Sequence, residues 1–233
     1  MAYSGTTKKK YFQMKNFLLL LLLIGSLHAS AQQINTKLKQ QLDSIMQVDQ
    51  ELRKLFTSIP QEEKEVILEK FGYTAKDLEQ KGWEIVAKQD TIHIHRVKEI
   101  ISSYGYPGKS LVGTPTNKAA WYVIQHSNQL EKFFPLIQKA GEEKEIPMTL
   151  VATMEDRILM YRGEEQKYGT QLKSGVINDP ETGERKWQFY FWPIRSPEKV
   201  NALREQVGFE RSIEEYAESM NVTYKKLKLE DVK

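Results

Sequence analysis

The chain has 233 residues, of which 40% are hydrophobic and 28% are charged. This balance is ordinary for a soluble globular protein and excludes a polytopic membrane protein, a collagen-like fibre and a wholly disordered chain. Residues 1–31 hold four lysines and no acid, so the remainder carries 30 basic against 31 acidic residues and lacks the positive charge expected of a nucleic-acid-binding protein.

The first predicted element is a secretory signal peptide over residues 1–31. Asn16–Leu27 is an apolar run that is too short to span a bilayer. Lys15 precedes this run, and Ala29 and Ala31 follow it as the small residues that a signal peptidase needs. An uncleaved anchor is the alternative, but the short apolar run favours cleavage.

We expect a mature chain that begins near Gln32, is periplasmic or secreted, and keeps no stable membrane anchor. Met14 is a better start for this leader than Met1, because the charged region is then compact. The sequence contains no cysteine, which excludes disulfides, thiolate metal sites and a lipid-modified N-terminal cysteine.

Helical periodicity dominates the next part of the chain. Apolar residues recur every three or four positions, and residues that cap or break helices separate the segments. Residues 84–97 fit a weak strand alternation as well as a helix, and we favour a helix that begins near Thr91. The predicted helices span residues 34–56, 61–70, 75–80, 91–104, 116–126, 129–143 and 148–162.

The pattern changes after Gln166. Residues 168–177 and 185–194 are separated by a turn-rich linker, and the second segment is dense in aromatic residues that favour strands. Two further helices are predicted at 198–206 and 212–220. The predicted fold class is mainly α: a single helical domain over residues 32–224, one β-hairpin near 168–194 in the C-terminal third, and a charged tail over 225–233 that we expect to fray.

Ser103–Ser110 reads SYGYPGKS and is close to a phosphate-binding loop. That motif needs a glycine where Ser103 stands, a strand before it and a helix directly after it. A helix is predicted before this segment, and Gly113 and Pro115 interrupt the residues after it. We therefore interpret the segment as a turn in which the glycines relieve backbone strain.

Two predicted helices place a titratable residue on an otherwise apolar face. His126 follows Val123 at helical spacing, and Asp156 follows Ala152. A buried Asp156 needs a partner, because an isolated buried charge is costly; the candidates are Arg157, His126 and a backbone amide. A His126–Asp156 pair would provide a general base with the carboxylate that orients it, whereas the alternative is an ion pair that only fixes two helices.

His93 and His95 form an H-x-H pair. On a strand both imidazoles would face one way and could bind a metal together with His126 or Asp90, whereas on a helix they diverge. Because a helix is predicted here, we expect neither a metal site nor a cofactor.

The segment Tyr168-Gly169-Thr170-Gln171 follows the helix that carries Asp156. Its neutral donors and acceptors suit a sugar, an amide or a peptide. The aromatic residues at 187–192 would form a stacking platform for sugars, but such a run is more often a strand buried on both faces.

Several motifs are spread over most of the chain: Asp49-Gln50-x-x-Arg53, Asp90-x-x-His93, Gly105-Tyr-Pro-Gly108 with Val112-Gly113, Ala119-Ala120-Trp121 leading to Gln125-His126, Asp156-Arg157, Gly163-x-x-Gln166-x-Tyr168-Gly169-Thr170-Gln171, Pro193-Ile194, Arg204 and Val207-Gly208. Together they resemble an uncharacterised family of bacterial proteins that is known only as a domain of unknown function. The resemblance covers about residues 45–216. One departure is His93, where the family more often has asparagine, and an amide would not replace a metal ligand.

The resemblance carries no established activity. It implies that these polar residues form one recurrent set, which is either a pocket or an unusually charged structural core. We interpret the chain as an exported protein with a polar pocket, and the first hypothesis is a hydrolase-like enzyme that acts on an envelope glycan or peptide.

In that hypothesis His126 is the general base, Asp156 is its orienting carboxylate, and Arg157 stabilises an anion or oxyanion. The candidate substrate-binding residues are Asp49, Gln50, Arg53, Gln125, Gln166, Tyr168, Thr170 and Gln171, of which the first three rest on the resemblance alone. One alternative is a non-catalytic module that binds a ligand or a protein through the same pocket or the aromatic hairpin. The other is an interaction protein in which the polar cluster only fixes the fold. The oligomeric state stays open.

Overall fold

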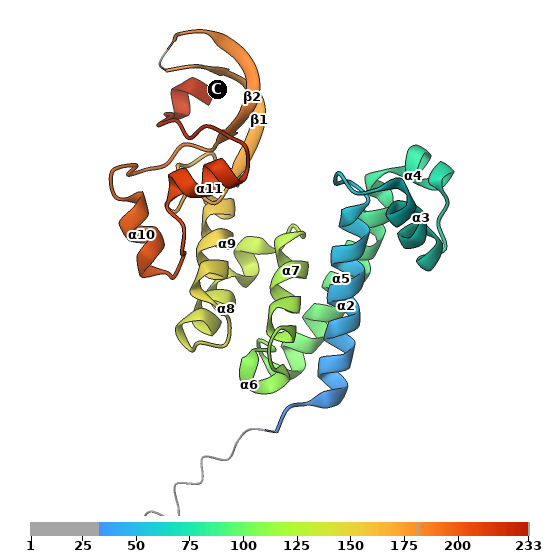
Figure 1. Cartoon of the computed structure of the whole chain (residues 1–233). Helices are drawn as coiled ribbons and strands as arrows, with labels where there is room; N and C mark the ends of the chain where they lie inside the picture. The colour runs from blue at the N-terminus through green and yellow to red at the C-terminus, as the bar shows by residue number, and fades with distance from the viewer. Residues whose placement is uncertain (1–32, 181, 233) are drawn as a thin grey trace, which may run out of the picture. The chain divides into compact units, whose positions relative to one another are not determined.

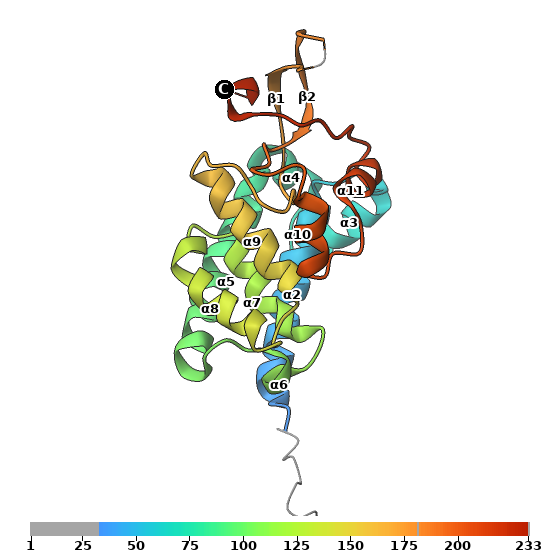
Figure 2. The same ribbon diagram turned by 90° about the vertical axis from the view of Figure 1, so that its left-hand side faces the viewer.

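Ten α-helices and one two-stranded hairpin make up the part of the chain that the computed structural model describes, residues 33–180 and 182–232 (Figures 1 and 2). This confirms the mainly α class with a hairpin in the C-terminal third. The predicted signal peptide lies outside the described residues. The helices are α2 (Thr36–Lys54), α3 (Gln61–Lys70), α4 (Ala75–Lys81), α5 (Trp83–Tyr104), α6 (Lys109–Val112), α7 (Ala119–Gln125), α8 (Leu130–Glu142), α9 (Met148–Tyr161), α10 (Val200–Gln206) and α11 (Ile213–Ser219), with 3₁₀ turns η1 (Thr116–Lys118) and η2 (Leu229–Val232).

Helices α2 and α5 are the longest of these helices and lie side by side (Figure 1). Buried residues recur along α2 at helical spacing from Leu38 to Leu52. Helix α5 begins at Trp83, earlier than the predicted start near Thr91, because Gly82 adopts a positive φ of 47° and lets α4 and α5 follow each other directly. The ambiguous segment is therefore wholly helical.

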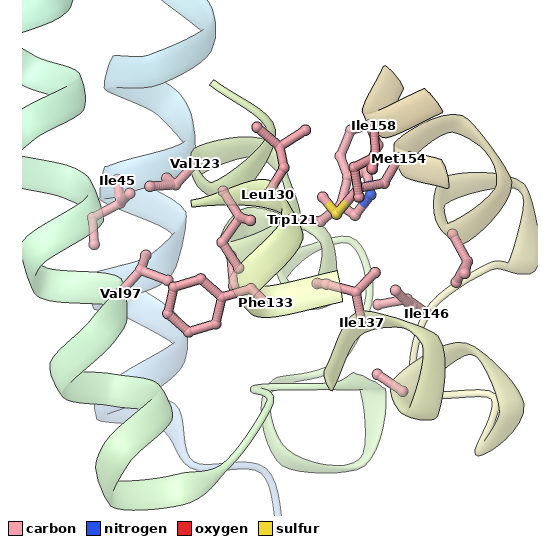
Figure 3. Close-up of a cluster of buried hydrophobic side chains, with 14 residues drawn as sticks. Ile45, Val97, Trp121, Val123, Leu130, Phe133, Ile137, Ile146, Met154 and Ile158 are labelled. Atoms are coloured by element: carbon pink, nitrogen blue, oxygen red, sulfur yellow. The ribbon is translucent and has the colours of Figure 1, made fainter. Parts of the chain in front are cut away.

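The short helix α7 lies in the middle of the largest apolar cluster (Figure 3). Five of its seven residues are buried, and it packs against α2, α5 and α8, while α8 packs on α9. The indole of Trp121 donates a hydrogen bond of 2.9 Å to the carbonyl of Leu150 in α9. These contacts fix the end of α7, where His126 follows.

The hairpin consists of antiparallel strands β1 (Leu172–Asn178) and β2 (Arg185–Phe191), in a register that pairs Leu172 with Phe191. Both strands are shorter than predicted. The aromatic run is divided between two environments: Tyr190 and the two residues after it are buried, whereas Trp187 and Phe189 are 61% and 58% exposed. The run is therefore not a strand buried on both faces.

The charged tail packs against the hairpin instead of fraying. Leu227 is 6% exposed and lies in a cluster with Ile177, Tyr190 and Trp192, and Lys225 lies 2.5 Å from the carboxylate of Asp179. Both views of the ribbon place the C-terminal end next to the hairpin (Figures 1 and 2). Apolar residues between the charges anchor this segment.

Residues from Ile34 onward form one compact unit. None of the described helices combines the length and the apolar character that crossing a membrane would need.

Candidate functional site

His126 directly follows α7, at the edge of the main core. Its Nδ1 atom lies 3.1 Å from Oδ1 of Asp49, which projects from α2. Asp49 is 3% exposed, whereas the side chain of His126 keeps 18% of its surface exposed. Nε2 of His126 has no hydrogen-bond partner within the described residues, and this atom keeps solvent-accessible surface. One edge of the imidazole is therefore held by a carboxylate and the other is open to solvent.

Asp49 holds the surrounding side chains together. Its Oδ2 accepts a hydrogen bond of 2.6 Å from Gln50, and its Oδ1 accepts one of 3.2 Å from Nη2 of Arg53. The same nitrogen of Arg53 lies 2.5 Å from Oδ1 of Asp90, so it ties α2 to α5. Burial raises the pKa of Asp49, but the hydrogen bond and charge of His126, together with Arg53, outweigh it and hold the pKa below its ordinary value.

Asp156, the predicted partner of His126, binds backbone amides instead. Its carboxylate accepts hydrogen bonds from the amides of Lys167 (2.7 Å), Tyr168 (3.1 Å) and Thr170 (3.0 Å) and from the Thr170 hydroxyl (2.9 Å). The loop after α9 folds back over the fully buried Asp156, and its amides need acceptors because they belong to no helix or strand. Of the three candidate partners, the backbone amide is correct, and the predicted pair of His126 with Asp156 does not form. Burial raises the pKa of Asp156, and these hydrogen bonds oppose the rise.

Gln166 holds the same loop against the hairpin. Its side chain has no exposed surface. Its Nε2 donates to the carbonyls of Gln171 (3.1 Å) and Trp192 (2.6 Å), and its Oε1 accepts the amide of Gln171 (2.8 Å). The backbone of Gln166 adds a parallel bridge beside Ile194, with hydrogen bonds to Pro193 and Arg195. Because the side chain is enclosed and fully paired, Gln166 stabilises the fold and does not contact substrate.

Arg157 connects the loop with the end of α7. Its Nε donates to Oε1 of Gln171 (3.1 Å), and its Nη1 donates to the carbonyl of Gln125 (3.3 Å), the residue before His126. Among the described residues no carboxylate lies within ion-pair distance of Arg157. Burial lowers its pKa, Tyr161 opposes this, and the nearby charge of Arg53 lowers it further. Arg157 is thus a half-buried cation with only neutral acceptors, next to an accessible imidazole.

The predicted residues fall into two groups that Arg157 joins. The first group, which we call the His126 site, comprises Asp49, Gln50, Arg53, Asp90, Gln125, His126 and Arg157. The second, the loop network, comprises Asp156, Gln166, Tyr168, Thr170, Gln171 and Arg204. Tyr168 enters this network through its carbonyl, which accepts a hydrogen bond of 2.8 Å from Arg204, and burial raises the pKa of its phenol to about 12.

The His126 site contains atoms that could ligate a metal. One atom each from Asp49, Asp90 and His126 lies within 4.8 Å of the others. However, Arg53 donates to both carboxylates and already supplies the positive charge that they would seek from a cation. The donor set fits a carboxylate pair bridged by arginine better than a metal site.

The histidine pair on α5 adds no ligand to this site. Its backbone is helical, as predicted, and the two side chains diverge: His93 is 6% exposed, whereas the His95 side chain is 77% exposed.

The segment that resembles a phosphate-binding loop carries its own anion. The carboxylate of Glu145 accepts a hydrogen bond of 2.8 Å from the amide of Ser110. Gly108 lies against the same side chain so closely that a Cβ at this position would collide with it. An internal carboxylate therefore lies where a bound phosphate would have to approach.

The sequence matches the model of a family of unknown function, DUF6624, over residues 36–229. The chain belongs to this family. The match confirms the resemblance seen in the motifs, and it spans every residue of the His126 site and the loop network. Searches of curated proteins and of solved structures found no match. Membership of DUF6624 therefore carries no activity to this chain.

Two residues of this DUF6624 chain were less prominent in the sequence than in the structure. Asp49 follows Ile45 at helical spacing and precedes Leu52, the same signal that drew attention to Asp156. Arg204 follows the buried Val200 in the same way. Asp49 and Arg204 are both charged residues on an otherwise apolar face of a helix, which marks them in the sequence. Helical spacing does not identify the groups that they bind.

Proposed function

We propose that this protein is an exported, hydrolase-like enzyme that acts on a cell-envelope glycan or peptide, with His126 as its general base. One observation carries the proposal: a buried carboxylate, Asp49, holds one nitrogen of His126 and leaves the other open to solvent. Asp49 takes the orienting role that the spacing suggested for Asp156.

The chemistry follows from the hydrogen bonds. An ionised Asp49 can only accept, so Nδ1 of His126 carries the proton and Nε2 presents a lone pair. Nε2 can take a proton from a water molecule as the water attacks an acyl carbon of a peptide or an acylated glycan. The imidazolium that forms, which Asp49 stabilises, then gives this proton to the leaving amine or alcohol as its bond to the acyl carbon breaks. Arg157 donates to the backbone carbonyl of Gln125, the residue before His126, and has no carboxylate partner among the described residues, so it is suited to stabilise negative charge on a substrate oxygen.

Export and substrate class rest on different observations. The leader supports export, and an exported enzyme encounters glycans and peptides of the envelope. Arg157 donates to the backbone carbonyl of Gln125 and to Oε1 of Gln171, and neutral groups of this kind suit hydroxyl and amide substrates. Oligomeric state does not enter the proposal.

A non-catalytic binding module is the second candidate. Asp49 already accepts from three side chains, and Arg53 is shared with Asp90. A network that is so fully paired suits a rigid binding surface, in which His126 and Arg157 would hold a ligand without transferring a proton.

The test uses the purified protein with a panel of envelope glycans and peptides. His126→Ala should lower kcat/KM by about 10²–10⁴-fold on any substrate that turns over, and Asp49→Asn should also lower kcat. His95→Ala is the matched control, because this exposed histidine lies outside the site, and it should leave turnover unchanged. Full activity in folded His126→Ala would refute the proposal. Saturable binding without turnover by the unaltered protein would favour the binding module.

A further inference from the structure

A pocket of about 390 Å³ lies apart from the His126 site, between α9, α10 and the segment that leads into α11. Thr149 and Thr153 from α9 line one side, Thr170 from the loop network lines another, and Phe209 and Tyr216 close it. Both ribbon views place α10 next to α9 (Figures 1 and 2). No member of the His126 site lines it, and Thr170, a candidate substrate-binding residue in the sequence, lies in this pocket instead.

Arg204 is the buried cation of this pocket. It is 2% exposed, and its guanidinium lies over the rings of Phe209 (4.7 Å) and Tyr216 (5.2 Å). Its Nε donates to the carbonyl of Arg211 (2.9 Å) and its Nη1 to the carbonyl of Tyr168. Its third nitrogen, Nη2, makes no hydrogen bond within the described ranges and is not enclosed, so it remains available to the pocket that Arg204 lines.

In the described part of the chain, no carboxylate forms an ion pair with Arg204. Asp156 and Glu214 are near enough to affect its pKa, which burial lowers and these charges raise. Neither is within ion-pair distance: Asp156 is committed to the loop amides, and Glu214 accepts from Asn201. A buried guanidinium with carbonyl partners alone retains its full charge, and an isolated buried charge is costly.

The rest of the lining suits a negatively charged ligand that also has an apolar part. The hydroxyl of Thr149 makes no hydrogen bond within the described residues, so it can donate to a ligand. The lining also contains Arg211 and Glu210, whose opposite formal charges cancel. The net positive charge of the lining is therefore that of Arg204. Phe209 and Tyr216 supply aromatic surface.

We propose that this pocket binds a small organic oxyanion, a carboxylate or a phosphate ester, with the oxyanion on Arg204 and Thr149 and the apolar group against Phe209. The pocket is a second site, and its occupancy does not depend on the chemistry proposed for His126. Gly208 turns the chain shortly after α10 with a φ of +90°, a conformation that favours glycine, and a Cβ at this position would lie 4.0 Å from Cγ2 of Thr149.

The test titrates the purified protein with benzoate and with phenyl phosphate and follows the backbone amides by NMR. Benzamide is the neutral probe that matches benzoate in shape. We expect saturable shifts at Thr149, Thr153 and Thr170 with at least one of the two anions and none with benzamide; the anion that binds identifies the head group. Equal binding of benzamide, shifts confined to other regions, or no shift with either anion at millimolar concentration would overturn the proposal.

Two variants separate binding from folding. Thr149→Val should weaken binding of the anion by roughly tenfold, because one hydrogen bond to a charged group is lost. Thr91→Val, on the exposed side of α5, is the matched control and should leave affinity unchanged. Arg204→Gln should abolish binding, but it also removes two hydrogen bonds to backbone carbonyls and could prevent folding. In that event the result with Thr149→Val is the one that tests the proposal. Unchanged affinity in folded Thr149→Val contradicts the assignment of the head group.

Discussion

His93 is a buried imidazole one turn after Asp90 on α5, and its Nδ1 has no hydrogen-bond partner in the part of the chain that the structure describes. Burial lowers its pKa, the charges of Asp49 and Asp90 oppose this, and Arg53 lowers it further. The unfolded chain titrates His93 near the ordinary value of about 6.5. Below that pH the unfolded chain binds a proton that the folded chain resists, so acidification should destabilise the protein.

His93→Asn should therefore flatten the dependence of stability on pH. Between pH 7 and pH 5 the free energy of unfolding should fall less in the variant than in the unaltered protein. The measurement is urea denaturation at both values, a range in which most carboxylates stay ionised. His95→Asn, two residues further along the same helix but exposed, should keep the original slope. Identical slopes for all three proteins would show that His93 is not the group responsible.

At this scale the sequence predicts which residues are buried and polar better than it predicts their partners. His126 and Asp156 both lie on apolar stripes, and both have partners, as expected. The pairing was wrong because Asp49 and Asp156 satisfy the same spacing rule, and spacing within one helix does not tell which other helix faces it. The amides that bind Asp156 belong to a loop and leave no periodic signal.

At the scale of elements, Leu227 shows how the tail is attached to the hairpin. Its side chain lies among Ile177, Tyr190 and Trp192. Leu227→Ala should lower the free energy of unfolding by about 2–4 kcal/mol, through lost apolar burial and the cavity that remains. The measurement is urea denaturation, with near-ultraviolet circular dichroism to follow Trp192.

Val176→Ala is the control for this change, because Val176 lies on β1 with 49% of its surface exposed. It should alter stability by less than about 0.5 kcal/mol. If Leu227→Ala lowers the free energy of unfolding by no more than Val176→Ala does, the tail does not stabilise the hairpin by packing.

Helices and hairpin were predictable because long periodic segments and turn residues leave strong local signals. Two capping boxes, at Thr74 with Asp77 and at Ser212 with Glu215, mark helix starts that the sequence also marks. The early start of α5 and the packed tail were missed. The start of α5 depends on the conformation of Gly82, which joins α4 directly to α5. The tail depends on a few apolar residues, such as Leu227, that pack against the hairpin and form no periodic pattern.

At the scale of the whole molecule, the charge distribution and the leader predict a chain that is processed on export. Protein recovered from the periplasm or the medium should begin near Gln32, which intact-mass spectrometry would detect. Leu20→Arg should block export and leave the leader attached, because a charge interrupts the apolar run. A chain that starts at Met14 should be exported as well as the full sequence. Recovery of an exported protein that still carries residues 1–31 would refute cleavage.

Helix α7 carries both the middle of the core and the proposed base. Five of its residues are buried, and the helix packs against three others just before His126. Substitutions that change the volume of this core must move the end of the helix and with it the distance between Nδ1 and Asp49. If His126 acts as proposed, variation at positions that touch no ligand would therefore alter the proposed activity. In that case the same few apolar side chains would set both the stability of the fold and the geometry of the base.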